Sequence, residues 1–256
     1  MTRILTYHDV LGDSEDADTG FSGVAAGRYK VLLTDFRAHL DAIAAAGIDV
    51  GLLEPGRRSP RAVLSFDDGG ASALLAAREL ERRGWRGHFL VTTGRIGSPG
   101  FLDREGVMEL ARRGHAVGSH SVSHPTYFGR LAPAEMAREW RESATVLAAL
   151  LGEPPSTASV PGGFVTSAVL ESAGACGYRL LMTSRPTSRS SVLGELTVVG
   201  RYTIRDRTPA AVAAALAGGP SLSAARQRAA WTAKQAAKRL GPRTFERLRR
   251  ARARPV

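Results

Sequence analysis

Strand-like and helical patterns alternate along the first 217 residues, and glycine marks many of the places where a helical pattern ends. Short apolar runs predict strands at residues 4–7, 48–53, 61–66, 88–92, 116–118, 157–160, 179–183 and 196–204. Helical periodicity predicts helices at residues 35–46, 71–83, 104–113, 133–151, 166–176 and 209–217. This alternation predicts one α/β domain with a parallel sheet, either open or closed into a barrel, whose active site lies at the carboxyl ends of the strands.

The composition is that of a folded globular protein, with 43% hydrophobic and 23% charged residues. The net charge of +11 is concentrated near the carboxyl end, because the segment from Ala224 onward holds eleven Arg and Lys residues and one acid, Glu246. The charge therefore says little about the chemistry of the main domain. Turn-forming residues at 218–222 predict a linker between a domain at residues 1–217 and a basic helical extension at residues 223–256.

The basic extension admits three hypotheses. Trp231, Ala237, Leu240 and Leu248 lie at helical spacing, and the Gly-Pro pair at 241–242 predicts a division into two helices. Such a segment is suited to an anionic membrane surface. Docking on the domain or on a partner protein, and a solvated basic helix, are the alternatives. Nucleic-acid binding is not favoured, since no recognition fold accompanies the charge.

The chain contains little that points to disulfides, redox chemistry or a membrane span. Its single cysteine, Cys176, lies in an apolar stretch and is expected to be a buried thiol. No apolar run reaches the roughly 18 residues of a transmembrane helix. The first residues have neither the apolar core nor the cleavage site of a signal peptide, which predicts a cytoplasmic protein, peripheral to the inner membrane face if the extension binds lipid.

An acidic pair, Asp67 and Asp68, directly follows the predicted strand at 61–66. Two buried neighbouring carboxylates are costly to keep ionised, since burial and like charge both raise a carboxyl pKa, and a bound cation would remove that cost. Asp is also favoured in turns and helix caps, so the pair alone leaves both explanations open.

A histidine pair, His120 and His124, follows the predicted strand at 116–118. The spacing of four positions brings both imidazoles to one side of a helical turn or tight loop. Imidazole nitrogen and carboxylate oxygen are ligands that Zn²⁺ accepts, and three protein ligands with an open position are typical of a catalytic zinc site. An isolated pair at this spacing is still more often structural.

Taken together, these motifs resemble a known family. The string Ala-Val-Leu-Ser-Phe-Asp-Asp-Gly at 62–69, followed by His-Ser-x-x-His-Pro at 120–125, resembles the first two motifs of the NodB-type polysaccharide deacetylases, carbohydrate esterase family four. Tyr-His-Asp-Val at 7–10 and Val-Pro-Gly-Gly at 160–163 extend the resemblance to residues 1 to about 205. It implies a distorted, partial (β/α) barrel that removes N-acetyl groups from sugars.

The resemblance also implies roles for the residues of the motifs. Asp68, His120 and His124 would hold one divalent metal ion, Zn²⁺ with Co²⁺ or Ni²⁺ as alternatives, and Asp67 would be the general base. A backbone N–H near Pro161 and Gly162 would stabilise the oxyanion. The implied substrate is an N-acetylated polysaccharide or glycoconjugate of cell-surface glycan synthesis.

The chain departs from the family pattern at two places. It has no histidine after His124, so the late histidine that many members use as the acid is absent. We assign the acid to His8, which resembles the arrangement in deacetylases of poly-N-acetylglucosamine; a structural role beside Asp9 is the alternative. The family arginine two residues before the motif proline is replaced by Ser159. The candidates to replace that arginine are Arg179, Arg185 and Arg201, and we favour Arg201.

The remaining ring side chains receive structural or secondary roles. His39, His88 and His115 are expected to be structural, while Tyr127, Phe128 and Phe164 are candidates to stack on a sugar.

Three functional hypotheses follow from the sequence. The first is a sugar N-deacetylase. The second is a hydrolase of another C–N bond, such as a cyclic amide, which fits the change at Ser159. The third is a catalytically silent glycan-binding protein.

Overall fold

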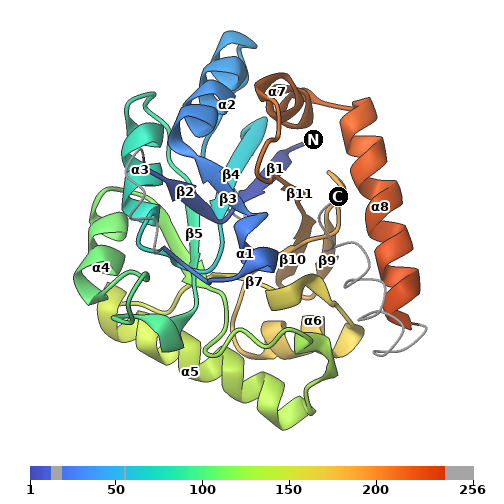
Figure 1. The fold of residues 1–256 in the computed structure, drawn as a ribbon. Coiled ribbons are helices and arrows are strands. Elements are labelled where there is room, and N and C mark those ends of the chain that lie inside the picture. The colour runs from blue at the N-terminus through green and yellow to red at the C-terminus, as the bar shows by residue number, and fades with distance from the viewer. Residues whose placement is uncertain (13–18, 55, 240–256) are drawn as a thin grey trace.

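The computed structural model describes residues 1–12, 19–54 and 56–239. Its main sheet has nine strands in the order β11-β1-β4-β5-β6-β7-β8-β10-β9, and every neighbouring pair is parallel except β10 and β9. The strands are β1 (Arg3–Tyr7), β4 (Ala62–Phe66), β5 (His88–Val91), β6 (Ala116–Ser119), β7 (Thr157–Ser159), β8 (Leu180–Thr183), β9 (Ser191–Leu193), β10 (Leu196–Gly200) and β11 (Tyr202–Thr203). The sheet curls into a half-barrel, which confirms the predicted distorted, partial (β/α) barrel (Figure 1).

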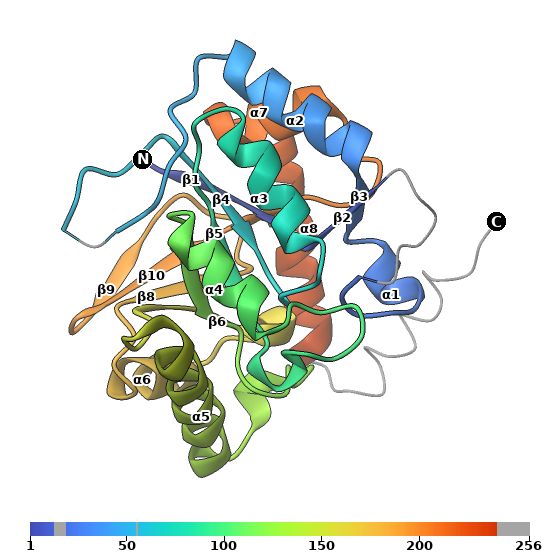
Figure 2. The ribbon, with the colours of Figure 1, turned by 90° about the vertical axis from the view of Figure 1, so that its left-hand side faces the viewer.

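Helices cover the outer face of the sheet. They are α2 (Leu33–Ala45), α3 (Ala73–Glu81), α4 (Arg104–Arg112), α5 (Pro133–Leu151), α6 (Ser167–Ala175) and α7 (Ala210–Gly218). Figure 2 shows α2, α3 and α4 in succession over one face. Strand residues alternate between two environments, as with Leu5 under the helices and Ile4 inside the barrel. None of the helices in the described ranges is long and apolar enough to cross a membrane.

The structure contains short elements that the sequence analysis missed. A second, two-stranded parallel sheet joins β2 (Asp9–Leu11) to β3 (Lys30–Leu32), next to the short helix α1 (Val24–Gly27). These elements and β9 are only three or four residues long, so they are too short for a periodic pattern to reveal them.

The predicted strand at 48–53 is wrong. In this segment Val50 makes a single isolated bridge to Ala62. Strand β4 pairs with β1 along its whole length but with β5 only at Ser65 and Phe66, and Val50 bridges the edge of β4 that β5 leaves free. The pairing involves this one residue, so the segment does not form a strand.

The predicted single strand at 196–204 is also wrong, and its interruption matters for the site. Strand β10 pairs with β8 and β9, whereas β11, which follows it in the chain, pairs with β1 at the opposite edge of the sheet. The chain thus crosses the seam of the half-barrel at Arg201, the residue between the two strands. The apolar run is divided into two strands because its two parts pair with strands at opposite edges of the sheet, and local periodicity carries no information about pairing partners.

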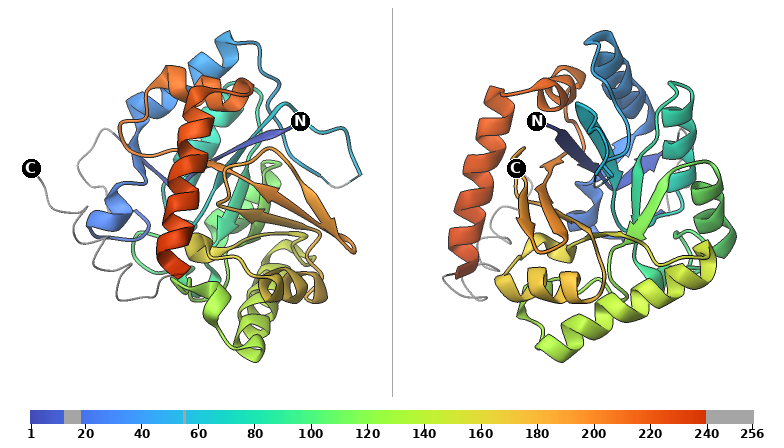
Figure 3. Two further views of the ribbon diagram at one scale, coloured as in Figure 1. Left: turned by 90° about the vertical axis from the view of Figure 1, so that its right-hand side faces the viewer. Right: turned by 180° about the vertical axis from the view of Figure 1, so that it is seen from behind.

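The carboxyl-terminal part of the described chain packs along this seam. Three residues separate helix α8 (Leu222–Arg239) from the end of α7 at Gly218. The Gln227 side-chain amide accepts from the backbone N–H of Thr203 (3.1 Å) and donates to its carbonyl (2.9 Å), so it occupies the edge of β11. Figure 3 shows α8 lying across this side of the barrel. The predicted helix break at 241–242, with Leu240 and Leu248, lies outside the described residues.

Candidate active site

The four motif residues lie where two strands end. Asp67 and Asp68 follow β4, and His120 directly follows β6. Their backbones extend the sheet, since Asp67 N–H donates to the Tyr7 carbonyl (3.1 Å) and His120 N–H to the Val91 carbonyl (2.8 Å). The carboxyl ends of β4 and β6, the two parallel strands on either side of β5, therefore bring the acidic and histidine motifs together.

Asp68, His120 and His124 form a cluster that suits a metal ion. One ligand atom from each lies within 4.8 Å of the others. The Nε2 atoms of His120 and His124 lie 3.5 and 3.4 Å from Asp68 Oδ1. This buried Oδ1 atom has no hydrogen-bond partner within the described residues. Burial, followed by the charges of Asp67 and Asp9, raises the pKa of Asp68 well above its usual range. A cation between these three side chains would remove that penalty, so the donor set fits a divalent metal.

Ser159 orients His120 for this role. The Ser159 hydroxyl donates to Asp67 Oδ1 (3.1 Å) and lies 2.6 Å from His120 Nδ1. Because the hydroxyl proton is directed to the carboxylate, the serine oxygen accepts from Nδ1–H. The Ser159 carbonyl is a second acceptor at 3.1 Å. Burial lowers the pKa of His120 to about 3, so the ring is neutral and Nε2 presents a lone pair to the cluster.

Replacing Ser159 by Ala is expected to weaken zinc binding by about tenfold, the lower end of the range for a lost ligand-orienting partner, because the backbone carbonyl still accepts from Nδ1–H. The measurement is a competition titration against a chromophoric chelator. Ser172→Ala, which removes a buried hydroxyl without a partner on α6, is the matched control. Equal zinc affinity in the two variants would show that Ser159 does not orient the ligand.

The metal-site loops hold an unusual backbone conformation. Asp68, Ser121 and His124 have φ values of 77°, 64° and 57°, and Arg207 is the one other non-glycine residue with positive φ in the described ranges. Such conformations cost free energy and persist where the surroundings enforce them. Three of the four lie in this site, so the fold stabilises this arrangement of the side chains at the expense of local strain.

Glu139 on α5 holds the histidine loop, a role that the sequence analysis missed. One carboxylate oxygen accepts from the backbone N–H groups of Val122 and Ser123 (both 2.9 Å), and the other accepts from the Ser123 hydroxyl (2.6 Å). Charge-assisted bonds of this kind are stronger than neutral ones. The sequence feature that could have indicated this role is an acidic residue on the apolar face of a predicted helix, next to Trp140.

Arg201 meets Asp67 from the seam of the barrel. The guanidinium forms two parallel bonds of 2.7 Å, from NH1 to Oδ1 and from NH2 to Oδ2, and both side chains are buried. Burial alone would raise the pKa of Asp67, but the charges of Arg201 and His120 and the Arg201 hydrogen bonds hold it below its usual range. Asp67 is therefore an ionised carboxylate with a fixed orientation. Of the other two candidates, Arg179 pairs with Glu195 and Arg185 lies over Trp231.

His8 lies between β1 and β2, within the electrostatic influence of the site. Its ring lies against that of Tyr29 with a centroid distance of 4.6 Å and an interplanar angle of 34°, and its buried Nδ1 has no hydrogen-bond partner in the described part of the chain. Burial lowers the pKa of His8, as does Arg201, while Asp67 raises it. The free enzyme thus holds His8 as a neutral imidazole.

The Val-Pro-Gly-Gly motif forms the short 3₁₀ turn η3 (Pro161–Gly163) against the histidine loop. Gly162 has φ of 63°, and a Cβ added there would lie 2.1 Å from the Thr126 carbonyl oxygen. Only glycine permits this approach. The turn places the backbone of residues 161–162 beside the loop that carries His124.

The other histidines and the candidate sugar-stacking rings lie outside the Asp68–His120–His124 cluster. His39 bonds the Thr208 carbonyl (2.6 Å), His115 bonds Glu81 (2.8 Å), and His88 accepts from Leu53 N–H (3.0 Å), all away from the cluster. Phe128 is wrong as a sugar-stacking residue, because it is fully buried against Trp140. Tyr127 and Phe164 are partly exposed.

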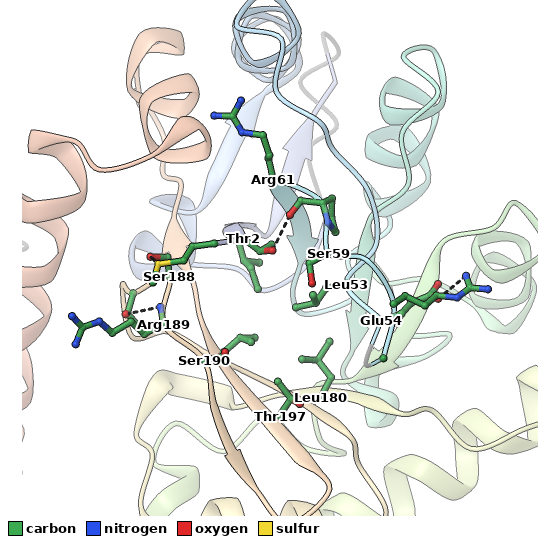
Figure 4. Close-up of a pocket in the computed structure, with 18 residues that line it drawn as sticks. Thr2, Leu53, Glu54, Ser59, Arg61, Leu180, Ser188, Arg189, Ser190 and Thr197 are labelled. Carbon is green, nitrogen blue, oxygen red and sulfur yellow. Dashed lines mark hydrogen bonds and ion pairs between the residues drawn. The ribbon is translucent and has the colours of Figure 1, made fainter.

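A sizeable cavity lies away from these residues. Its volume is about 670 Å³, and it opens near the amino ends of β1, β4, β8 and β10, opposite the motif residues. Aliphatic and hydroxyl side chains such as Leu53, Leu180, Ser59 and Thr197 line it, and Arg61 and Arg189 point away from it (Figure 4). It contains none of the metal-ligating side chains.

Comparison with known proteins agrees with the motifs and the fold. The family model described as polysaccharide deacetylase matches residues 55–181. The chain belongs to the polysaccharide deacetylase family. The matched segment of this deacetylase family member contains Asp67, Asp68, His120, His124 and Ser159, while His8 and Arg201 lie outside it. No curated protein matches the sequence.

Solved structures of deacetylases share the fold. A polysaccharide deacetylase from Bacillus cereus aligns with a TM-score of 0.69 and 19% identity, over 84% of this chain and 68% of that one. The IcaB protein from Ammonifex degensii aligns with a TM-score of 0.67 and 22% identity, over 85% and 97%. The deacetylase PplD from Streptococcus pyogenes, in complex with acetate, aligns with a TM-score of 0.66 and 20% identity, over 82% and 94%. These likenesses show that the deacetylase fold extends well beyond residues 55–181.

Proposed function

We propose that the protein is a metal-dependent hydrolase that removes N-acetyl groups from an N-acetylated sugar, as part of a polysaccharide or glycoconjugate of cell-surface glycan synthesis. The observation that carries the proposal is that the candidate metal ligands and the proposed base are linked by hydrogen bonds. The Asp68–His120–His124 cluster fits a divalent metal, and Ser159 links His120 directly to the carboxylate of Asp67.

The reaction converts an acetamide and water into acetate and an amine. A divalent metal, Zn²⁺ or alternatively Co²⁺ or Ni²⁺, bound by Asp68, His120 and His124 would supply a Lewis acid and lower the pKa of a bound water. Asp67 is the proposed base that accepts a proton from the attacking water. Its two oxygens are already bonded to Arg201, so the carboxylate keeps its orientation throughout the transfer.

Two further groups complete the proposed machinery. His8 is the proposed acid that gives a proton to the leaving nitrogen; because burial lowers its pKa, it must gain that proton in the substrate complex, close to the Asp67 charge. The backbone beside Pro161 and Gly162 is proposed to stabilise the oxyanion, since η3 lies against the histidine loop.

The proposal is tested by metal analysis and by acetate release from N-acetylglucosamine oligomers, with His124→Ala as the comparison. We expect one equivalent of zinc and release of acetate by the unaltered protein, and loss of both in the variant. Zinc binding without acetate release from any N-acetylated glycan would overturn the deacetylase proposal and favour hydrolysis of another C–N bond or silent glycan binding. Absence of bound metal would overturn the site.

We also propose that the outward face of α8 contacts an anionic membrane surface, which would hold the enzyme peripherally at the cytoplasmic face. Arg226, Arg228 and Lys234 are exposed, while Ala224 and Gln227 face the domain. Trp231, part of the predicted apolar stripe, lies against Arg185, so charge would dominate such binding. Co-sedimentation with anionic liposomes should fall when these three basic residues are changed to Gln, and unchanged binding would remove the idea.

A further inference from the structure

An exposed arginine lies next to the candidate metal site on a platform of aromatic rings. Arg95, at the end of the 3₁₀ turn η1 (Thr93–Arg95) that follows β5, lies over Phe21 (5.6 Å to the ring centroid) and Phe101 (5.9 Å). The Phe21 ring in turn lies 4.8 Å from the ring of His124. One aromatic ring thus connects the guanidinium to a proposed metal ligand.

Arg95 has no counter-ion within the described ranges. It forms none of the ion pairs found there, whereas arginines elsewhere on the surface do: Arg112 pairs with Glu105, Arg113 with Glu81 (2.8 Å) and Arg179 with Glu195 (2.9 Å). The aromatic faces hold the guanidinium in place and leave its N–H groups directed to solvent.

Two more arginines repeat the arrangement at the carboxyl ends of other strands. Arg205, after β11, lies 5.9 Å from the centroid of Tyr29, the ring that lies against His8. Arg185, after β8, lies 5.8 Å from the centroid of Trp231. Neither makes an ion pair with a described residue, and both are exposed.

The acids at this end of the barrel do not neutralise these charges. Asp67 is bonded to Arg201, Asp68 belongs to the metal cluster, and Asp9 is buried and accepts from Thr19 (2.9 Å) and Ser72 (3.0 Å). Asp103 accepts from the backbone N–H of Gly106 (2.7 Å) at the start of α4, and Asp206, which follows Arg205 in the chain, is exposed. Residues 13–18, which include four acids, lie outside the described ranges. Among the described residues, Arg95 is therefore bordered by aromatic rings and forms no ion pair.

We infer that the sugar substrate carries a negatively charged oxyanion group, a carboxylate or a phosphate, and that Arg95 binds it beside the reacting acetamide. The inference rests on the proposed deacetylase function. A guanidinium offers two parallel N–H donors to either anion, and the exposed edge of Phe21 gives the adjoining sugar an apolar contact. Arg185 and Arg205 add positive potential that increases the rate of encounter with an anionic glycan.

The test compares substrates that differ in charge. The zinc-loaded protein is given an N-acetylglucosamine hexasaccharide, a hexasaccharide alternating N-acetylglucosamine with glucuronic acid, and N-acetylglucosamine joined to a lipid through pyrophosphate. We expect kcat/KM for at least one anionic substrate to exceed that for the neutral one by about tenfold or more. We expect this advantage to shrink as salt rises from about 0.05 M to about 0.5 M. Comparing the two anionic substrates shows whether the site prefers a carboxylate on a polymer or a phosphate on a lipid carrier.

Variants assign the effect to Arg95. Arg95→Gln should lower the anionic-to-neutral ratio of kcat/KM by about tenfold, mainly through KM, and Arg95→Lys should restore part of it because the charge returns without the planar donors. Arg138→Gln makes the same charge change at an exposed position on α5 and is the control. A ratio equal in Arg95→Gln and Arg138→Gln, or a neutral substrate preferred by the unaltered protein, would overturn the inference.

Calorimetric binding separates this inference from the proposed function. If no substrate releases acetate, the deacetylase proposal fails, but tighter binding of an anionic than of the neutral oligosaccharide, lost in Arg95→Gln, would still support the anion site. If acetate is released from all substrates and binding is indifferent to charge and to Arg95, the function stands and the anion site fails.

Discussion

Replacing Asp67 by Asn is expected to lower the rate of acetate release by about 10²- to 10⁴-fold, the contribution of a positioned general base, while zinc remains bound. Asn keeps the size of the side chain but cannot accept the proton of the attacking water. Zinc should remain because Asp67 is not in the Asp68–His120–His124 cluster. Acetate release and metal content, measured on the same preparation, check the two parts of this prediction.

The matched control is Asp49→Asn, the same chemical change at an exposed carboxylate that lies 3.5 Å from Arg58. It should leave both measurements unchanged, because exposed ion pairs contribute little. A rate in Asp67→Asn within about twofold of the unaltered protein would rule out the base role. Loss of zinc together with activity would instead indicate that Asp67 supports the metal site.

Replacing Arg201 by Gln should lower the free energy of unfolding by about 3–5 kcal/mol, the usual cost of removing one partner of a buried ion pair. The two 2.7 Å bonds to Asp67 disappear, and a buried carboxylate keeps its desolvation penalty without compensation. Denaturant unfolding at neutral pH measures the loss. Arg179→Gln removes the exposed pair with Glu195 and should change stability by less than about 1 kcal/mol.

The effect of Arg201→Gln should depend on pH in a definite direction. In the unaltered protein the pKa of Asp67 is held below its usual range, so its stabilising contribution is present above the unfolded value of about 3.9 and is lost as pH falls through the lower folded pKa. Without Arg201, burial dominates and raises the folded pKa. The variant then gains relative stability when Asp67 is protonated.

The difference in unfolding free energy between the two proteins should therefore begin to shrink as pH falls through the raised folded pKa of Asp67 in the variant, above the usual value of about 3.9, and should keep shrinking until pH reaches the lower folded pKa of the unaltered protein. The acid limb of the activity profile should also move to higher pH in the variant. A stability difference that is constant with pH would mean that Arg201 acts through packing alone. Arg201→Lys keeps the positive charge but replaces the planar guanidinium by a single ammonium group. Its unfolding free energy should lie between those of the unaltered protein and Arg201→Gln.

Two residues, Ser159 and Arg201, contact Asp67, where the family resemblance leads us to expect a single arginine. The motif position that the family resemblance assigns to an arginine holds a serine here, and this small side chain bonds both His120 and Asp67. The guanidinium comes instead from the break between β10 and β11. The departure from the family motif is therefore not, by itself, a sign that Asp67 lacks an orienting partner.

Several features of the site followed from local sequence. Asp67 and Asp68 follow one apolar strand and His120 and His124 follow another, which predicted that these side chains lie at the same end of the sheet, because parallel strands bring their carboxyl ends together. Their roles as metal ligands and base came from the joint resemblance to the family motifs. The choice of Arg201 among three arginines also agrees with the contact to Asp67 that the structure contains. The strand at 48–53 failed because only one of its residues, Val50, pairs with β4.

The sequence by itself determined the parallel α/β architecture and placed the acid and histidine pairs at the carboxyl ends of its strands, since periodicity and short spacings are local properties. The tertiary structure alone decided that 196–204 splits at Arg201, that Glu139 holds the histidine loop and that Phe21 connects Arg95 to His124. These contacts join residues far apart in the chain, and only the curling of the sheet and the packing of its loops bring them together.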